Sequence, residues 1–367
     1  MENNKFIDYY KEVKIKLNKC INSFNKELIQ EENEFIKENL EVFSKLNSDG
    51  KLVRGTLVNL GYKIMNEDSS YSYPLALAFE IFQTSILIHD DLIDNDDLRR
   101  GKTTIHAYNY DKYYKLTNNE KSRKLADNIA ICIGDLGLYK ANYVISSNYN
   151  NDKNLGNILN YFNEVVINTI RGEALDVVLP FNEEFNLDDK NLEENILEIY
   201  KLKTAYYTIV GPLCLGMILG GASKCELEDI EKIGYNIGIA FQLQDDLLGI
   251  YGEDIGKPVG SDIEEFKQTL LYSYTKKNKK YYDELLKVYG KKATKENLER
   301  VREIFKDSGA YSYVLNMIDN LYTDAISNLN NVKWIKDEDK ELINGFIDYL
   351  KNRRKWWKNI RYHIMLV

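Results

Sequence analysis

The sequence predicts an all-α protein built as one large domain, for three reasons. Its 367 residues, 44% of them hydrophobic and 29% charged, can bury a large core and have the composition of a globular protein. Apolar residues recur at helical spacing along most of the chain, and no alternation lasts long enough to predict a sheet. Proline, which interrupts helices, occurs only four times, at Pro74, Pro180, Pro212 and Pro258.

The helices are expected in a regular succession. Residues 1–16 read as the start of an amphipathic helix, without the apolar core of a signal peptide. Connections rich in Asn, Asp, Lys and Gly separate the later segments, and no Pro- or Ser-rich linker divides residues 1–367 into two domains. The pattern predicts helices over 27–46, 74–94, 122–147, 154–179, 191–222, 226–251, 262–288, 294–305 and 309–328, and from 337 onward.

One segment raises the question of a membrane. Residues 205–223 carry no charge and are about long enough to cross a bilayer, but they contain Pro212 and four glycines. A helix that is apolar on all sides is also what a deep core requires, so we expect a buried central helix and no stable membrane insertion.

Charge and cysteine content exclude several classes of function. The net charge of −8 argues against nucleic-acid binding, which needs a basic surface. The four cysteines form no Cys-x-x-Cys pair, so neither a zinc site nor a disulfide framework is indicated. Free thiols predict a reducing compartment, the cytoplasm.

The first candidate site lies at the end of the segment 80–94. Positions four apart share one face of a helix, so Asp90 and Asp94 lie together, with Gln83 nearby. Two like charges one turn apart become favourable when a hard cation lies between them, and Mg²⁺ prefers carboxylate, water and phosphate oxygens. Taken alone, the motif could equally be a solvated helix end.

A second motif favours a metal site over a solvated helix end. Gln242, Asp245 and Asp246 again end a long apolar segment. Two Asp-Asp pairs in this position are hard to explain as solvated surface, and together they predict a polynuclear metal site for a diphosphate. Cations occur where phosphates would need them, although each alone is more often a surface charge: Lys51, Arg54, Arg99, Arg100, Lys203, Lys257 and Lys267.

From about Gly50 to Lys267 the chain resembles the trans-prenyltransferases, the short-chain polyprenyl diphosphate synthases. The resemblance is carried by an ordered set of motifs: Gly50-Lys51 with Arg54, Gln83, Asp90-Asp91-Leu92-Ile93-Asp94, Arg99-Arg100-Gly101, Lys203-Thr204, Phe241 to Asp246, Lys257 and Asp262. It implies an all-α bundle around a deep central cavity, usually a homodimer, with this motif-bearing core at about 50–267 and a C-terminal helical part at about 290–367.

The resemblance also implies a role for each motif. Asp90 and Asp94 would bind two Mg²⁺ ions and Asp245 a third, with Asp91 and Asp246 completing the two metal-binding motifs. Arg99, Lys203 and Lys257 would hold an allylic diphosphate, and Thr204 and Gln242 would face the allylic cation as weak dipoles. The site for isopentenyl diphosphate would consist of Gly50, Lys51, Arg54, Gln83, Arg100 and Lys267.

The chain departs from the family pattern at two places. Gly249 stands where many relatives have a third Asp in the second motif, so that Asp245 and Asp246 must suffice, with help from Asp254. Ser85 and Ile86 stand where aromatic side chains close the cavity floor in relatives that stop at fifteen carbons. The small Ser85 favours geranylgeranyl diphosphate as product, with farnesyl diphosphate as a shorter one.

Other functions remain open at this point. Farnesyl diphosphate could be the main product, or the chain could be a non-catalytic partner subunit, although such a subunit should have lost carboxylates or cations. A terpene cyclase would share the Asp-rich helix but would not need Lys51, Arg54 and Arg100. The basic segment 351–363 with Trp356 and Trp357 is a solvated helix, a lid over the isopentenyl diphosphate site or a membrane-surface contact, and the sequence does not separate these interpretations.

Overall fold

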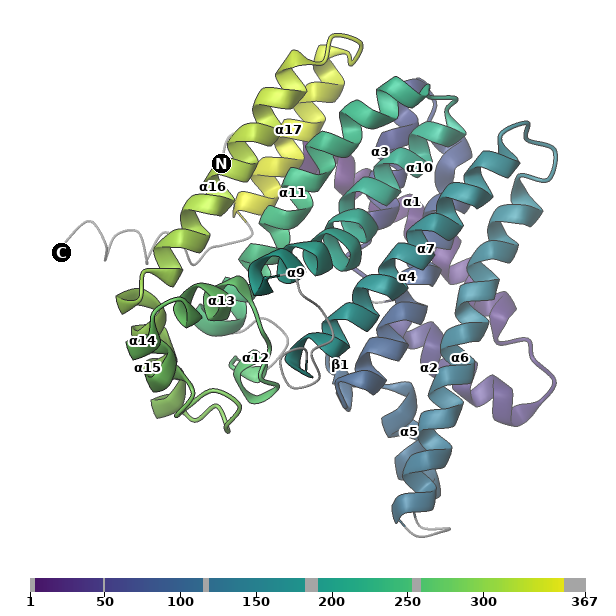
Figure 1. The fold of residues 1–367 in the computed structure, drawn as a ribbon. Coiled ribbons are helices and arrows are strands. Elements are labelled where there is room, and N and C mark those ends of the chain that lie inside the picture. The colour runs from purple at the N-terminus through teal and green to yellow at the C-terminus, as the bar shows by residue number, and fades with distance from the viewer. Residues whose placement is uncertain (1–3, 49, 115–118, 182–190, 253–258, 353–367) are drawn as a thin grey trace. The chain divides into compact units, whose positions relative to one another are not determined.

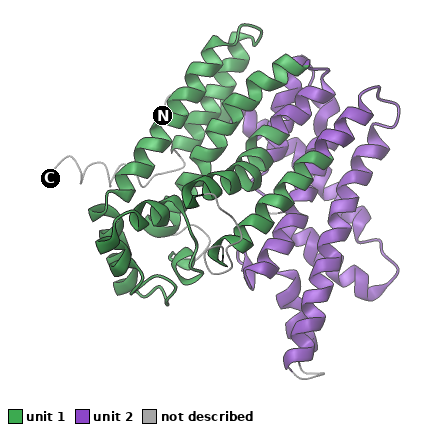
Figure 2. Cartoon of the chain, viewed as in Figure 1, with its two compact units in different colours: residues 1–7, 163–211, 224–367 green, residues 8–162, 212–223 purple. Residues whose placement is uncertain are grey.

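The computed structural model describes residues 4–48, 50–114, 119–181, 191–252 and 259–352. Helices make up most of these residues, and the chain divides into two compact units (Figures 1 and 2). Unit 1 comprises residues 1–7, 163–211 and 224–367, and unit 2 comprises residues 8–162 and 212–223. Apart from one hairpin of two short strands, the elements in the described ranges are helical, and this confirms the all-α prediction.

Unit 2 contains most of the N-terminal half of the chain. Its core includes the buried side chains of Phe43, Phe79, Phe82 and Phe162. Its elements are α1 (Lys5–Leu28, from Asp8 onward), α2 (Glu34–Ser48), α3 (Val53–Met65), η1 (Ser70–Ser72), α4 (Tyr73–Ile93), β1 (Leu98–Arg99), β2 (Lys102–Thr103), α5 (Ile105–Tyr113), α6 (Asn119–Asn148), the start of α7 (Leu155–Val178) and α10 (Gly211–Leu219, from Pro212 onward).

Two glycines let α3 and α10 pack with their backbones in contact. A Cβ atom at Gly61 would lie 2.0 Å from the carbonyl oxygen of Leu213, and one at Gly216 would lie 2.0 Å from that of Val58. No side chain fits at either position. The same helix α3 begins just after the predicted cation Lys51 and has Arg54 in its first turn.

Unit 1 contains the remaining helices. Helix α11 packs on η3 and on α16, and these contacts organise its core. Its elements are the rest of α7, η2 (Leu179–Phe181), α9 (Leu192–Ile199), the π-helix η3 (Tyr200–Val210), α11 (Lys224–Tyr251), α12 (Ser261–Glu264), α13 (Leu270–Lys276), α14 (Lys279–Leu285), α15 (Lys295–Asp307), α16 (Ala310–Asn331) and α17 (Asp337–Asn352).

Two predicted helices differ from the structure. The segment 27–46 spans the end of α1 and most of α2, because the chain breaks between them and Asn33 accepts a hydrogen bond from Ile36 N at the start of α2 (3.2 Å). The segment 262–288 is three short helices. Phe266 has a left-handed backbone (φ 55°), and Asn278 caps α14 by accepting a hydrogen bond from Lys280 N.

The apolar segment in the middle of the sequence belongs to one long helical stretch, 192–219, which passes from α9 through η3 into α10. By length and composition this stretch could cross a bilayer, but 83% of its most apolar window is buried inside the structure. Burial on this scale is what a core helix shows, as the sequence predicted.

Candidate functional site: two clusters of carboxylates and cations

The first cluster, in unit 2, lies at the C-terminal end of α4. Asp90 and Asp91 belong to its last turn and Asp94 is its C-cap residue. The chain then turns sharply through Asn95 (φ 56°), and Asp96 N donates back to the carbonyl of Asp91 (2.8 Å). Because the C-terminal end of a helix carries partial negative charge, carboxylates there are unfavourable unless cations compensate them.

Arg99 supplies part of that compensation. It donates to Asp90 Oδ2 (3.0 Å) and pairs with Asp91, and its guanidinium lies 3.7 Å from Asp96 Oδ2. A tight hairpin positions it: β1 and β2 pair with Arg99 opposite Lys102, and the two loop residues, Arg100 and Gly101, have φ 55° and 75°. Positive φ at both central positions defines a type I′ turn, which suits a two-residue hairpin loop.

Asp91 is the most deeply buried of these carboxylates. Its side chain is 1% exposed, and burial raises its pKa to about 6 although the charge of Arg99 opposes this. Its Oδ2 atom has no hydrogen-bond partner within the described residues. An unsatisfied buried carboxylate oxygen fits a hard divalent cation, which prefers such oxygen ligands.

A pocket next to this cluster is lined by three cations. Arg99, Arg100 and Lys102 line it together with Thr84, Asp91 and the apolar Leu46, Leu87 and Ile88. Lys102 Nζ also donates to the carbonyl of Lys45 (2.9 Å). Lys102 and Thr84 were not among the predicted residues, although Lys102 directly follows the Arg-Arg-Gly motif. Positive charge therefore gathers on the wall of this small pocket, next to the buried Asp91.

The predicted residues near Gly50 are tied to α4 by Glu80. This fully buried carboxylate accepts a hydrogen bond from Gly55 N (2.7 Å), and burial raises its pKa, opposed by that bond and by the charges of Arg54 and Arg100. Lys51 is exposed, Arg54 is half-buried in the first turn of α3, and Gln83 is 8% exposed one turn after Glu80. Arg54 and Arg100 thus act on the same buried carboxylate.

The predicted floor residues lie in the body of unit 2. Ser85 is fully buried, and a Cβ atom at Gly137 of α6 would lie 2.0 Å from its hydroxyl oxygen, with Phe43 also adjacent. Ile86 is half-buried and, one turn before Asp90, shares its face of α4. Further toward the start of α4, Phe79, Phe82 and Phe162 form three edge-to-face contacts with ring centroids 5.6–5.9 Å apart.

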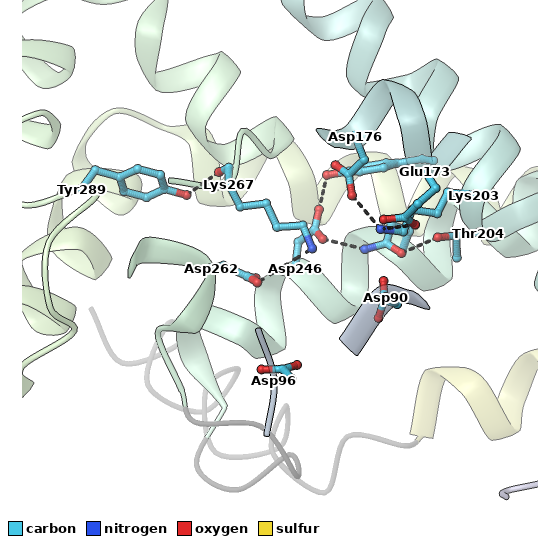
Figure 3. Close-up of polar contacts among 12 residues, drawn as sticks. Asp90, Asp96, Glu173, Asp176, Lys203, Thr204, Asp246, Asp262, Lys267 and Tyr289 are labelled. Carbon is cyan, nitrogen blue, oxygen red and sulfur yellow. Dashed lines mark hydrogen bonds and ion pairs between the residues drawn. The ribbon is translucent and has the colours of Figure 1, made fainter. Parts of the chain in front are cut away.

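The second cluster, in unit 1, centres on Lys203 of η3 (Figure 3). Its ammonium lies 2.8 Å from Glu173 Oε2 and 2.8 Å from Asp176 Oδ2, both on α7. The backbones come close because Gly172 has no side chain: a Cβ atom there would lie 2.6 Å from Lys203 N. Glu173 and Asp176 were not among the predicted residues, although their i, i+3 spacing places them on one face of α7.

Thr204, next to Lys203, starts a chain of hydrogen bonds. Its hydroxyl donates to Gln242 Oε1 (2.6 Å), Gln242 Nε2 donates to Asp246 Oδ1 (2.8 Å), and the Tyr200 hydroxyl donates to Asp246 (Figure 3). Both Lys203 and Thr204 lie in the π-helix, a rare conformation that is frequent at functional sites.

Asp245 and Asp246, adjacent in sequence, lie in different environments. Asp246 is 3% exposed, and burial raises its pKa to about 7, opposed by Lys267 and by the hydrogen bonds from Tyr200 and Gln242. Asp245 is only half-buried. Of the two, Asp245 is therefore the more accessible to a ligand.

Lys267 lies near α11, the helix that carries Asp245 and Asp246. Its ammonium is 3.9 Å from Asp262 Oδ1, and its carbonyl accepts a hydrogen bond from the buried Tyr289 (2.7 Å; Figure 3). Among the other predicted residues, Lys257, Asp254, Trp356 and Trp357 lie outside the described residues.

Within the described ranges, no three His, Cys, Asp or Glu side chains come together as a complete metal site. Each cluster instead presents one or two accessible carboxylates beside cations. Such an arrangement leaves coordination positions for the oxygens of a phosphate ligand, which is how Mg²⁺ is commonly held in phosphate-transfer sites.

Comparisons with known proteins agree with this chemistry. The model of the polyprenyl synthetase family matches residues 36–307. Geranylfarnesyl diphosphate synthase of Aeropyrum pernix is 30% identical over 318 residues, which cover 84% of this chain and 92% of that protein. Geranylgeranyl diphosphate synthase of Saccharolobus solfataricus is 31% identical over 341 residues, covering 88% and 93%.

Among solved structures, one of a geranylgeranyl pyrophosphate synthase from Corynebacterium glutamicum, complexed with isoprenyl diphosphate and magnesium, is similar with a TM-score of 0.82. It is 25% identical in sequence, and the match covers 96% of this chain and 100% of that one. A geranylgeranyl pyrophosphate synthetase from Pyrococcus horikoshii shares the fold with a TM-score of 0.76 at 24% identity, covering 94% and 98%.

Proposed function

The chain belongs to the polyprenyl synthetase family and is a prenyltransferase that makes short-chain isoprenoid diphosphates, and we propose that its main product is geranylgeranyl diphosphate, with farnesyl diphosphate as a shorter one. The reaction we propose condenses isopentenyl diphosphate with an allylic diphosphate. The observation that carries it is the pairing of cations with carboxylates in both clusters, of Arg99 with Asp90 at the end of α4 and of Lys203 with Asp176 of α7.

The family uses a divalent metal, and we propose three Mg²⁺ ions for this chain. Asp90, Asp94 and Asp245 would hold them. Asp91 and Asp246 would complete the two metal-binding motifs. The bound ions supply Lewis-acid stabilisation of the charge that develops on the leaving diphosphate. The buried, unsatisfied Oδ2 atom of Asp91 supports this assignment.

The cations would bind and orient the two diphosphates. We assign Arg99, Lys203 and Lys257 to the allylic diphosphate, and Gly50, Lys51, Arg54, Gln83, Arg100 and Lys267 to isopentenyl diphosphate. Lys102, which lines the same pocket as Arg99 and Arg100, is assigned to isopentenyl diphosphate as well. Fixed positive charges of this kind stabilise the transition state because they need no reorganisation as charge develops.

Thr204 and Gln242 would stabilise the allylic cation. Because the Thr204 hydroxyl donates its hydrogen bond to Gln242, its lone pairs remain available to face a positive charge. The Gln242 amide is fixed in turn, since its NH₂ group donates to Asp246. Both groups are weak nucleophiles, so they can stabilise a carbocation without trapping it.

The length of the product depends on where the cavity ends. A helix rises about 1.5 Å per residue, so Phe82 lies roughly 12 Å and Phe79 roughly 16 Å along α4 from Asp90. We propose that the Phe79–Phe82–Phe162 cluster stops elongation at twenty carbons. Ile86, one turn before Asp90 and not aromatic, leaves the growing chain free to pass.

The test is an assay of the purified protein with Mg²⁺, isopentenyl diphosphate and allylic primers, followed by sizing of the products. We expect twenty-carbon diphosphates from the wild type and shorter products from Ile86→Phe, because the ring blocks the cavity above the aromatic cluster. Absence of turnover with every primer would contradict the proposal and favour the partner-subunit alternative. Unchanged product length in Ile86→Phe would contradict only the assignment of the floor.

We further propose that the protein is a cytoplasmic homodimer. None of the four cysteines, all of which lie in the described ranges, forms a disulfide, and this supports a reducing compartment. On α6, one exposed face carries Leu125, Ile131, Tyr139 and Tyr143, and Tyr139 is 77% exposed. Apolar side chains aligned on one helix face are typical of an interface between copies.

Light scattering should therefore give about twice the 42.8 kDa mass of the chain. The double variant Tyr139→Glu/Tyr143→Glu should shift the protein to monomers, because it places charges in a desolvated interface. As a control, Lys121→Glu alters the exposed start of the same helix and should remain dimeric. A wild-type protein that is monomeric at micromolar concentration would contradict the proposal.

A further inference from the structure

Phe266, the residue before Lys267, has a backbone conformation that a bulky side chain rarely adopts. It follows the short helix α12 and lies in the left-handed region, with φ 55°. Lys267 N donates to the carbonyl of Asp262 (2.9 Å), and Phe266 N donates to that of Ile263 (3.2 Å). These two bonds form a Schellman motif, in which the left-handed residue is usually glycine. A phenylalanine there is strained, and such strain persists only where the surrounding structure holds the residue in place.

Aromatic packing holds Phe266 in this conformation. Its ring contacts the buried Tyr272 and Tyr289 edge to face, with ring centroids 5.6 and 5.5 Å away. Gly290 leaves room for the ring, because a Cβ atom there would lie 2.8 Å from Phe266 Cδ2. The side chain of Phe266 therefore joins the end of α12 to the segment 289–290.

The segment 289–290 also binds the backbone next to Phe266. The Tyr289 hydroxyl donates to the carbonyl of Lys267 (2.7 Å; Figure 3), and Gly290 N donates to the carbonyl of Ile263 (2.8 Å). Burial raises the pKa of Tyr289 well above its ordinary value, so the hydroxyl keeps the proton that it donates. Ring packing at residue 266 and a hydrogen bond at residue 267 together restrict the direction in which the Lys267 side chain leaves the backbone.

That direction leads to the second cluster. The ammonium of Lys267 lies 3.9 Å from Asp262 Oδ1, and its charge lowers the pKa of Asp246, which burial raises. Figure 3 shows the Lys267 side chain reaching toward both carboxylates. The side chain is 34% exposed, so its ammonium remains accessible to a ligand. Lysine has a long and flexible side chain, and a fixed backbone reduces the entropy lost when its ammonium binds an anion.

We propose that Phe266 and Tyr289 are positioning residues for Lys267, and that their contacts place its ammonium to bind a substrate diphosphate. Both act through Lys267 and do not themselves contact the substrate. This inference rests on the proposed function, in which Lys267 binds the diphosphate of isopentenyl diphosphate. A positioning role of this kind predicts a change in KM with little change in kcat, because the lost contact is one to the bound substrate.

A double-mutant cycle in steady-state assays tests the inference, with KM measured for isopentenyl diphosphate and for the allylic primer. The cycle compares the wild type with Phe266→Gly, Lys267→Ala and the double variant Phe266→Gly/Lys267→Ala. Glycine suits a left-handed backbone, so Phe266→Gly removes the ring without adding strain. Thermal unfolding identifies any variant that does not fold, and Phe266→Asn, whose side chain also tolerates this conformation, then replaces Phe266→Gly.

Tyr289→Phe tests the hydrogen bond separately, because it removes the hydroxyl that reaches Lys267 and keeps the ring. Tyr282→Phe is the matched control, since the hydroxyl of Tyr282 bonds to that of Tyr272 (3.0 Å) and not to the backbone of Lys267. The control should have the KM and kcat of the wild type.

We expect Phe266→Gly and Tyr289→Phe each to raise the KM for isopentenyl diphosphate by roughly 3- to 10-fold, the effect of losing about one hydrogen bond. Lys267→Ala should raise it by roughly 10- to 100-fold, because hydrogen bonds to charged groups are stronger. In the Lys267→Ala background, Phe266→Gly should raise KM no further, since no ammonium is left to position. A rise in the KM of the allylic primer instead would keep the positioning role and assign Lys267 to the other diphosphate.

The outcomes separate the inference from the proposed function. If Phe266→Gly raises KM by the same factor with and without Lys267, Phe266 acts only through the stability of its segment and the inference is wrong. Lys267→Ala with the wild-type KM for both substrates also overturns the inference, and leaves the condensation reaction itself unaffected. A wild type without turnover would contradict the proposed function and the inference with it.

Discussion

Lys203 shows how a single side chain organises the second cluster. Its ammonium lies 2.8 Å from carboxylate oxygens of both Glu173 and Asp176, and its side chain is only 24% exposed. A cation shared by two carboxylates keeps the local charge negative, so a metal–diphosphate complex can still be attracted. Lys203 is thus placed to contact the diphosphate without cancelling the metal site.

Lys203→Gln should lower kcat by roughly 10²- to 10³-fold, the loss typical when one fixed donor to a developing charge is removed. Lys201→Gln is the matched control, because Lys201 lies on the same π-helix but faces the Tyr235 ring at 4.8 Å. Steady-state kinetics with an allylic primer should show a near-normal rate for the control. Equal losses in both variants would mean that Lys203 acts only through the stability of η3.

At the level of elements, small residues bring α11 and η3 together. A Cβ atom at Gly238 would lie 2.4 Å from Ala205 Cα, and one at Gly234 would lie 2.9 Å from Val210 Cγ2. The spacing of four residues puts both glycines on the face of α11 that packs on η3. This close approach is what lets Thr204 reach Gln242.

Gly238→Val should destabilise the protein by about 1–3 kcal/mol or more, because the added side chain meets the backbone of η3 and not a flexible side chain. Gly156→Ala, near the start of α7, is the control: nothing lies within 4 Å of its Cβ position. That variant should be neutral or up to about 1 kcal/mol more stable, as expected when Ala replaces Gly in a helix. Chemical denaturation measures both, and a neutral Gly238→Val would contradict the packing argument.

At the scale of the whole molecule, the two motifs belong to different compact units. Unit 2 contains Asp90, Asp91 and Asp94, and unit 1 contains Asp245 and Asp246 (Figure 2). Each unit buries one acidic side chain of its motif, and burial raises the pKa of Asp91 and of Asp246. Buried carboxylates of this kind make the stability of the metal-free protein depend on pH.

The sign of that dependence follows from Asp246. Its pKa rises from the ordinary 3.8 to about 7, so the native state binds the proton more tightly than the unfolded chain. The free energy of unfolding should therefore fall as the pH rises from about 4 to about 7 and change little above that. The upper limit of the effect is roughly 4 kcal/mol, since one pKa unit corresponds to about 1.4 kcal/mol.

Asp246→Asn removes this titration and keeps the shape of the side chain. Urea denaturation in a chelator should show the wild type losing stability relative to Asp246→Asn between pH 4.5 and pH 7.5. A difference between the two proteins that does not change with pH would show that Asp246 has an ordinary pKa in the native state.

The helical class can be predicted from the sequence alone, and the same is true of which acidic residues share a helix face. The helical class follows from apolar periodicity, which is a local property of each segment. Asp90 and Asp94 lie on one face because residues four apart in a helix do so. Periodicity did not reveal where a helix is interrupted: the segment 262–288 breaks at Phe266 and Asn278, whose backbone and capping interactions are local exceptions to the pattern.

Which side chains from distant segments meet depends on tertiary packing. The contact of Lys203 with Glu173 and Asp176 depends on the close approach of η3 to α7 at Gly172. The burial of Asp246 beneath Tyr200 and the position of Asp262 against Gly249 likewise depend on packing. Spacing along one helix fixes only the face on which a residue lies, whereas contacts between segments also depend on how closely their backbones pack.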